Sequence, residues 1–144
     1  MEPDIRGAVS IRDQIEKHRD SENCAACHRK IDPSGFALET FNPIGIARTH
    51  YGKPSKSAKV DPSGITVDGQ SFNTIAEWKR IYAQQPKLLA NAFANHLISY
   101  GTGAPASFSD REEIEKIVQA SASNNYGVRS LIINVIQSKP FQTK

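Results

Sequence analysis

The feature that most constrains this chain is the pentapeptide Cys24-Ala25-Ala26-Cys27-His28, which contains both of its cysteines. Two thiols three residues apart lie on one side of a helical turn, and the histidine follows directly. Covalent attachment of a c-type haem uses this spacing: the thiols reach the two vinyl groups at one porphyrin edge, and the histidine becomes the proximal iron ligand. We therefore expect one covalent haem c, bound through Cys24 and Cys27, with His28 as its proximal ligand.

Other chemistries also use a cysteine pair, namely redox-active dithiols, short disulfides and halves of zinc sites. A thioredoxin-like site expects a βαβ context, which the hydrophobic pattern does not show. A structural zinc site needs two more ligands at matching spacing, and the chain has no second cysteine pair. The haem interpretation is therefore favoured.

The surroundings of such an iron are less defined by the sequence. In small class I cytochromes a proline a few residues after the motif supplies the carbonyl that orients the proximal histidine, and Pro33 is the candidate here. The alternative is that Pro33 only shapes a turn at 32–35, whose sequence is Asp-Pro-Ser-Gly.

The sixth iron ligand stays open between four possibilities. The only methionine is Met1, which we interpret as a start residue, so a histidine–methionine pair is not expected. His18 is the first candidate, because it continues the apolar face of the helix before the motif. His96 is the second, on an apolar helical face, and His50 lies beside a loop rich in glycine and proline. The fourth possibility is an iron that takes no ligand from the protein on its distal side.

The fold is predicted to be mainly α, with cytochrome c-like haem-binding helices and a C-terminal helical lobe that includes one short β-hairpin. We expect a helix over 10–19, a short one near 36–41, and a hairpin around a turn at 61–64. Four helices should follow. In the second of them, Leu89, Phe93, His96 and Tyr100 share the predicted apolar face.

The polar loop 51–58, broken by glycine and proline, is the best candidate for a domain boundary. It would divide a haem-binding lobe, 1–56, from a helical lobe, 57–144, unless the two form one integrated domain. Asp61 and Asp68 lack the alternating ligands and closing glutamate of a calcium loop, so we expect them to be turn residues.

Composition and charge limit the classes of partner that we expect this chain to bind. The net charge of +3 comes without a basic block, so no nucleic-acid partner is expected. No apolar run approaches the roughly 18 residues of a membrane span. The first residues lack the basic and apolar regions of a signal peptide. Because bacteria attach haem c outside the cytoplasm, we expect a piece of a longer exported protein, periplasmic or otherwise extracytoplasmic.

Long strings of this sequence resemble two known modules. Residues 2–45, with CHRKIDPSGFALE at their centre, resemble the cytochrome-like DUF1588 module of large exported proteins from Planctomycetes. VDPSGITVDGQSF, LISYGTG and YGVRSLIINVIQSKPFQTK resemble the DUF1585 module that follows it there. The resemblance implies a C-terminal region that transfers electrons, with other domains of the same protein as partners.

The resemblance also bears on the distal ligand. In this family the segment before the motif commonly carries a histidine, and His18 matches it. Many relatives have a methionine just after the motif, where this chain has Lys30 and Ile31. A methionine-ligated iron is therefore not implied here.

Three functions are compatible with these observations. The leading one is electron transfer by a mono-haem c-type cytochrome domain, to or from a redox partner protein. The second is a peroxidase-like or ligand-binding haem enzyme with an open distal site. The third is a structural role, in which haem links two lobes.

Overall fold

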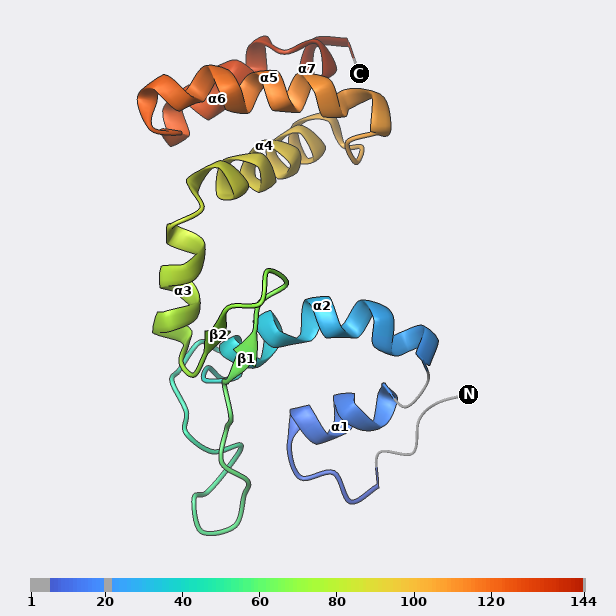
Figure 1. Ribbon diagram of the computed structural model, residues 1–144, viewed down its shortest axis with the longest axis vertical. Coiled ribbons are helices and arrows are strands. Elements are labelled where there is room, and N and C mark those ends of the chain that lie inside the picture. The colour runs from blue at the N-terminus through green and yellow to red at the C-terminus, as the bar shows by residue number, and fades with distance from the viewer. Residues whose placement is uncertain (1–5, 20–21, 144) are drawn as a thin grey trace. The chain divides into compact units, whose positions relative to one another are not determined.

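The structure, a computed structural model, describes residues 6–19 and 22–143 (Figure 1). The described residues contain seven α-helices and one two-stranded antiparallel hairpin, so the predicted mainly α fold is confirmed. The chain forms two compact units, Met1–Ile81 and Tyr82–Lys144, each with its own core. Every helix in the described part of the chain is too short or too polar to cross a lipid bilayer.

Helix α1 (Ile11–His18) begins at the capping box that the sequence predicts. The hydroxyl of Ser10 accepts a hydrogen bond from the backbone N–H of Asp13 at 3.0 Å, and the Asp13 carboxylate accepts from the N–H of Ser10 at 3.2 Å. These two bonds satisfy N–H groups that have no partner within the helix. They set the start of α1 at Ile11, the first residue of the apolar pair Ile11 and Ile15.

Helix α2 (Glu22–Leu38) carries the cysteine motif and is longer than predicted. The separate short helix near 36–41 is wrong, and the turn at 32–35, the alternative role of Pro33, does not form, because α2 continues through Pro33 to Leu38. A proline inside a helix removes one backbone hydrogen bond. Burial of Phe36 and Ala37, which are 4% and 0% exposed, offsets that loss.

The hairpin consists of β1 (Gly64–Ile65) and β2 (Ser71–Phe72). Its turn is not at 61–64 as predicted but at 66–70, where the N–H of Thr66 donates to the carbonyl of Gln70 at 2.9 Å. Gly69 supplies the positive φ of 86° that this turn requires.

The hairpin packs against α2 (Figure 1). A Cβ added at Gly64 would lie 2.7 Å from the Phe72 ring and 3.0 Å from Pro33, so only glycine allows this approach. Arg12 of α1 contacts both α2 and the segment before β1. Its guanidinium lies 4.0 Å from the Phe36 ring centroid and donates to the carbonyl of Asp61 at 3.1 Å. Among the described residues of the first unit, the buried hydrophobic ones are Phe36, Ala37, Val60 and Phe72.

Helix α3 (Ile75–Ala83) follows the hairpin and joins the two units. The Thr74 hydroxyl accepts from the N–H of Glu77 at 3.2 Å, as its sequence predicts, while the Glu77 carboxylate accepts from Asn73. The indole of Trp78 donates to the hydroxyl of Ser34 at 3.2 Å, which ties α3 to α2.

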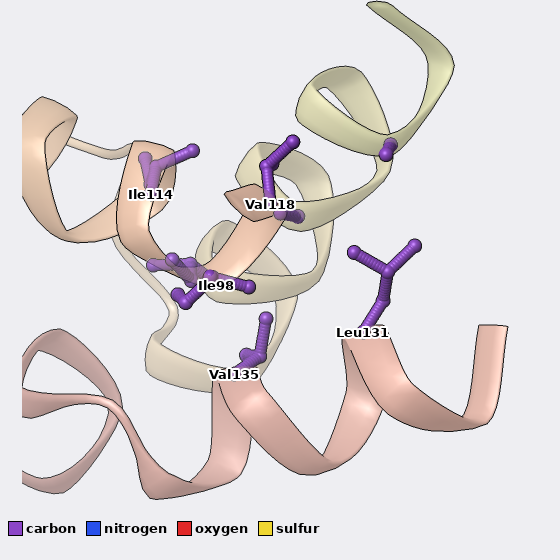
Figure 2. Packing of buried hydrophobic residues seen from close by; sticks show 8 residues of the cluster. Ile98, Ile114, Val118, Leu131 and Val135 are labelled. Atoms are coloured by element: carbon purple, nitrogen blue, oxygen red, sulfur yellow. The ribbon is translucent and has the colours of Figure 1, made fainter. Parts of the chain in front are cut away.

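The second unit is a small helical bundle whose helices pack around one core. The core residues come from α4, α5 and α6 and converge between them (Figure 2). Its elements are α4 (Pro86–Thr102), η1 (Phe108–Asp110), α5 (Arg111–Ser121), η2 (Ala122–Asn124), α6 (Val128–Gln137) and α7 (Lys139–Thr143).

The buried face of α4 differs from the predicted one. Ala90, Ala94 and Ile98 are 3% exposed or less, whereas Tyr100 is 88% exposed and Phe93 36%. Small side chains at the crossing let α5 and α6 approach α4 closely, so the bulky side chains lie to one side. The predicted face of Leu89, Phe93, His96 and Tyr100 is therefore wrong.

This correction can be tested by two substitutions two residues apart on α4. Ile98→Ala should lower the free energy of unfolding by about 2–5 kcal/mol, because Ile98 is fully buried. Tyr100→Ala should change it by less than about 0.5 kcal/mol. Urea unfolding followed by far-UV circular dichroism measures both. Equal losses in the two variants would contradict the observed face.

The cap of α1 makes the stability of this helix depend on pH. Hydrogen bonds lower the pKa of Asp13 below its ordinary value of 3.8, and the largest contribution comes from the hydrogen bond with the Ser10 side chain. A carboxyl group whose pKa is lower in the folded chain than in the unfolded chain stabilises the fold at pH values above its unfolded-state pKa. This contribution is lost as the pH falls through the folded-state pKa. Asp13→Ala should therefore reduce the helicity of 11–17, seen in Cα chemical shifts, at neutral pH but not in strong acid. A difference that persists in strong acid would contradict this.

Candidate functional site

Helix α2 brings the three residues of the motif together. Cys27 and His28 lie three and four residues after Cys24, so the three side chains project from neighbouring positions on one side of the helix. Both cysteines are free thiols, Cys24 half-buried and Cys27 exposed, and His28 is half-buried. The predicted trio therefore shares one helix side, with both sulfur atoms unbonded.

The imidazole of His28 is held by a buried carboxylate. Its Nδ1 lies 2.9 Å from Oδ1 of Asp32, one turn further along α2, and the Asp32 side chain is only 5% exposed. The guanidinium of Arg19, at the end of α1, lies 3.5 Å from the other carboxylate oxygen, Oδ2. At that separation Oδ2 is a buried oxygen with a charge partner but no hydrogen bond.

Beyond the motif, the same side of α2 is uncovered and apolar. Ile31 is 62% exposed and Leu38 51% exposed, and a Cβ built on Gly35 between them would meet nothing within 4 Å. We call Cys24, Cys27, Ile31 and Leu38 the α2 stripe. Their separations of three, four and seven residues keep them on one side of the helix.

The other predicted residues are placed as follows. His18 is the last residue of α1, and its side chain lies outside the described residues. His50 is half-buried, bridges to Lys59 in a short antiparallel pair, and has its Nδ1 3.0 Å from the Thr49 hydroxyl. His96 is exposed on α4 of the second unit. Each of the three stays a prediction as a distal ligand.

Two residues of the site were missed at the level of sequence. Asp32 lies in a tetrapeptide that is typical of a turn, although its spacing of four residues from His28 would pair the two on a continuous helix. Arg19 carried no signal, because its contact with Asp32 depends on how α1 and α2 pack. Pro33 lies inside α2 next to Asp32, and its role in orienting His28 stays a prediction.

Comparison with known families gives two matches. The family model described as a protein of unknown function, DUF1585, matches residues 68–141, just over half of the chain. The model described as a protein of unknown function, DUF1588, matches residues 1–51. The chain belongs to the DUF1585 family, with a DUF1588 module preceding it. No curated protein and no solved structure shows significant similarity to it.

The motif lies within the DUF1588 module, together with Arg19 and Asp32. DUF1588 and DUF1585 are cytochrome-like domains of unknown function. The DUF1585 match begins in the hairpin turn, whereas the compact units divide after Ile81, because the hairpin packs against α2. The predicted division into a haem-binding lobe, 1–56, and a helical lobe, 57–144, stays a prediction.

The different exposure of the two thiols can be measured in the haem-free chain. Cys27 should react with iodoacetamide faster than Cys24, because Cys27 is exposed and Cys24 half-buried. Peptide mass spectrometry of a labelling time course separates the two rates. In urea the rates should converge. A faster reaction at Cys24 in the folded chain would contradict the orientation of α2.

Proposed function

We propose that this chain is a mono-haem c-type cytochrome domain that transfers electrons. The observation that carries the proposal is the position of Cys24, Cys27 and His28 at the head of an uncovered apolar surface on α2. Two thiols attach the haem and one imidazole ligates its iron, and the α2 stripe provides a surface on which the porphyrin can pack.

The residues of the first unit fit such a group. Only four hydrophobic side chains are buried among its described residues, and its large hydrophobic side chains are often exposed. A bound porphyrin would remove part of this apolar surface from water, at roughly 25 cal/mol per Å². The large exposed hydrophobic residues of this unit are Val9, Ile31, Leu38, Ile44, Ile46, Ile65 and Val67.

When bound, the haem supplies a one-electron couple at its iron. The chain has three tasks towards it. Cys24 and Cys27 fix its edge to α2, so that the group cannot dissociate. His28 presents Nε2 as a ligand, because Nδ1 faces the Asp32 carboxylate. Ile31 and Leu38, which are exposed on the same side of α2 as the thiols, would help to exclude water from a bound haem and so favour a low-dielectric environment.

The setting of the domain is part of the proposal. Covalent attachment places the chain outside the cytoplasm, as one region of a longer exported protein. The electron then passes between this haem and either another domain of that protein or a separate redox partner. The matches to DUF1588 and DUF1585, both cytochrome-like, support this setting.

The decisive experiment is export of the chain into a bacterial periplasm together with the cytochrome c maturation proteins. The purified protein should carry one haem, which remains bound in denaturant and shows the pyridine haemochrome spectrum of a double thioether. Cys24→Ala with Cys27→Ala should abolish attachment, whereas Ser55→Ala, an exposed change in the same unit, should not. A wild-type chain that matures without covalent haem would refute the proposal.

The spectrum then separates electron transfer from catalysis. Six-coordinate, low-spin bands in both oxidation states, unaltered by cyanide or peroxide, support electron transfer. A high-spin ferric spectrum that shifts on adding these ligands would contradict it and favour the peroxidase-like function. Replacement of His18, His50 and His96 in turn by alanine identifies the distal ligand as the variant that loses the low-spin bands.

Packing of haem on the α2 stripe can be tested through stability. Ile31→Ser should change the unfolding free energy of the haem-free chain by less than about 0.5 kcal/mol, because Ile31 is exposed. In the haem-bearing chain the same change should cost about 1–3 kcal/mol, since Ile31 would be covered. Ile133→Ser, at a 45% exposed position of the second unit, is the matched control and should have little effect in either form.

A further inference from the structure

The contact between His28 and Asp32 has a meaning beyond haem attachment. We propose that Asp32 is a positioning residue for the iron ligand: its buried carboxylate fixes the ring orientation and tautomer of His28 and strengthens the imidazole as an electron donor to the iron. This inference rests on the proposed haem site. It adds a residue that sets the reduction potential of that site.

The geometry supports this role directly. Asp32 and His28 lie four residues apart on a continuous helix, so the carboxylate and the ring are held by one rigid element. Their atoms are 2.9 Å apart, a normal hydrogen-bond distance. With Nδ1–H donating to Asp32, the lone pair of the neutral ring is on Nε2, which is then the nitrogen that would ligate the iron.

A carboxylate acts on a ligating histidine more strongly than a neutral acceptor. A hydrogen bond to an ionised acceptor is roughly twice as strong as one between neutral groups. It also raises the basicity of the metal-bound nitrogen, which favours the more positive oxidation state of the metal. Because the Asp32 side chain is 5% exposed, water screens this interaction little.

Arg19 makes a buried carboxylate possible at this place. A buried charge without partners costs several kcal/mol, so it must be paired. Arg19 lies 3.5 Å from Oδ2 of Asp32 and also 3.7 Å from the carboxylate of Glu16. It reaches Asp32 from the end of α1, a different element, so the carboxylate is held from two sides.

The first test uses the haem-free chain, so that it does not depend on haem attachment. Long-range ¹H–¹⁵N correlation spectra, recorded at about pH 9, where an unperturbed imidazole is neutral, report which nitrogen carries the proton. His28 should be predominantly in the Nδ1–H form. In Asp32→Leu, which cannot accept a hydrogen bond, it should revert to the Nε2–H form that predominates in free side chains. Should Asp32→Leu fail to fold, Asp32→Asn replaces it and should reduce the Nδ1–H fraction.

The second test uses the haem-bearing chain. Asp32→Asn should raise the reduction potential, because a neutral amide donates less electron density through the ring. Glu39→Gln is the matched control: it removes the same charge from a carboxylate in the same unit that pairs with Arg48 instead. The rise in Asp32→Asn should clearly exceed that in Glu39→Gln.

The outcomes separate the two proposals. A chain that never acquires haem refutes the proposed function and leaves the tautomer measurement as evidence for the contact alone. A chain that carries haem, but in which Asp32→Asn and Glu39→Gln shift the potential equally, overturns the role of Asp32 and leaves the cytochrome assignment intact. A wild-type His28 in the Nε2–H form likewise overturns it.

Discussion

The first unit depends on one buried charge, the carboxylate of Asp32. A charge in this position must be paired, and its partners come from two helices, His28 of α2 and Arg19 at the end of α1. The pair with His28 requires an uninterrupted helix from His28 to Asp32, so α2 cannot end at the motif. The same continuity places Phe36 and Ala37 inward and leaves the α2 stripe outward.

The tetrapeptide Asp-Pro-Ser-Gly, which occurs at 32–35 and at 61–64, shows how the surroundings decide local structure. The first copy is helical, whereas residues 61–63 of the second lie in neither a helix nor a strand and Gly64 begins β1. In the first copy, Asp32 pairs with His28, and Phe36 and Ala37 just after the tetrapeptide are buried, whereas in the second copy Asp61 accepts from the N–H of Ser63 at 3.0 Å. Local propensity alone predicts a turn for both.

Much of the site could be predicted because its chemistry depends on spacing within one helix. The motif, the capping of α1 and the helical character of the second unit follow from residue patterns that act locally. The Asp32–Arg19 contact and the buried face of α4 depend on packing between elements. For α4 the misleading signal was size: bulky residues marked the apolar face, while the small residues Ala90 and Ala94 form the crossing.

If haem is attached as proposed, the open α2 stripe would also affect how the protein matures. Because Ile31 and Leu38 are exposed in the polypeptide alone, the helix that carries the thiols can form before anything covers it. Enzymes that act on the thiols would thus meet a folded helix with an accessible side. Until that side is covered, it is an apolar surface of the kind that promotes association between chains. A bound haem that covers the stripe would therefore also protect the protein from such association.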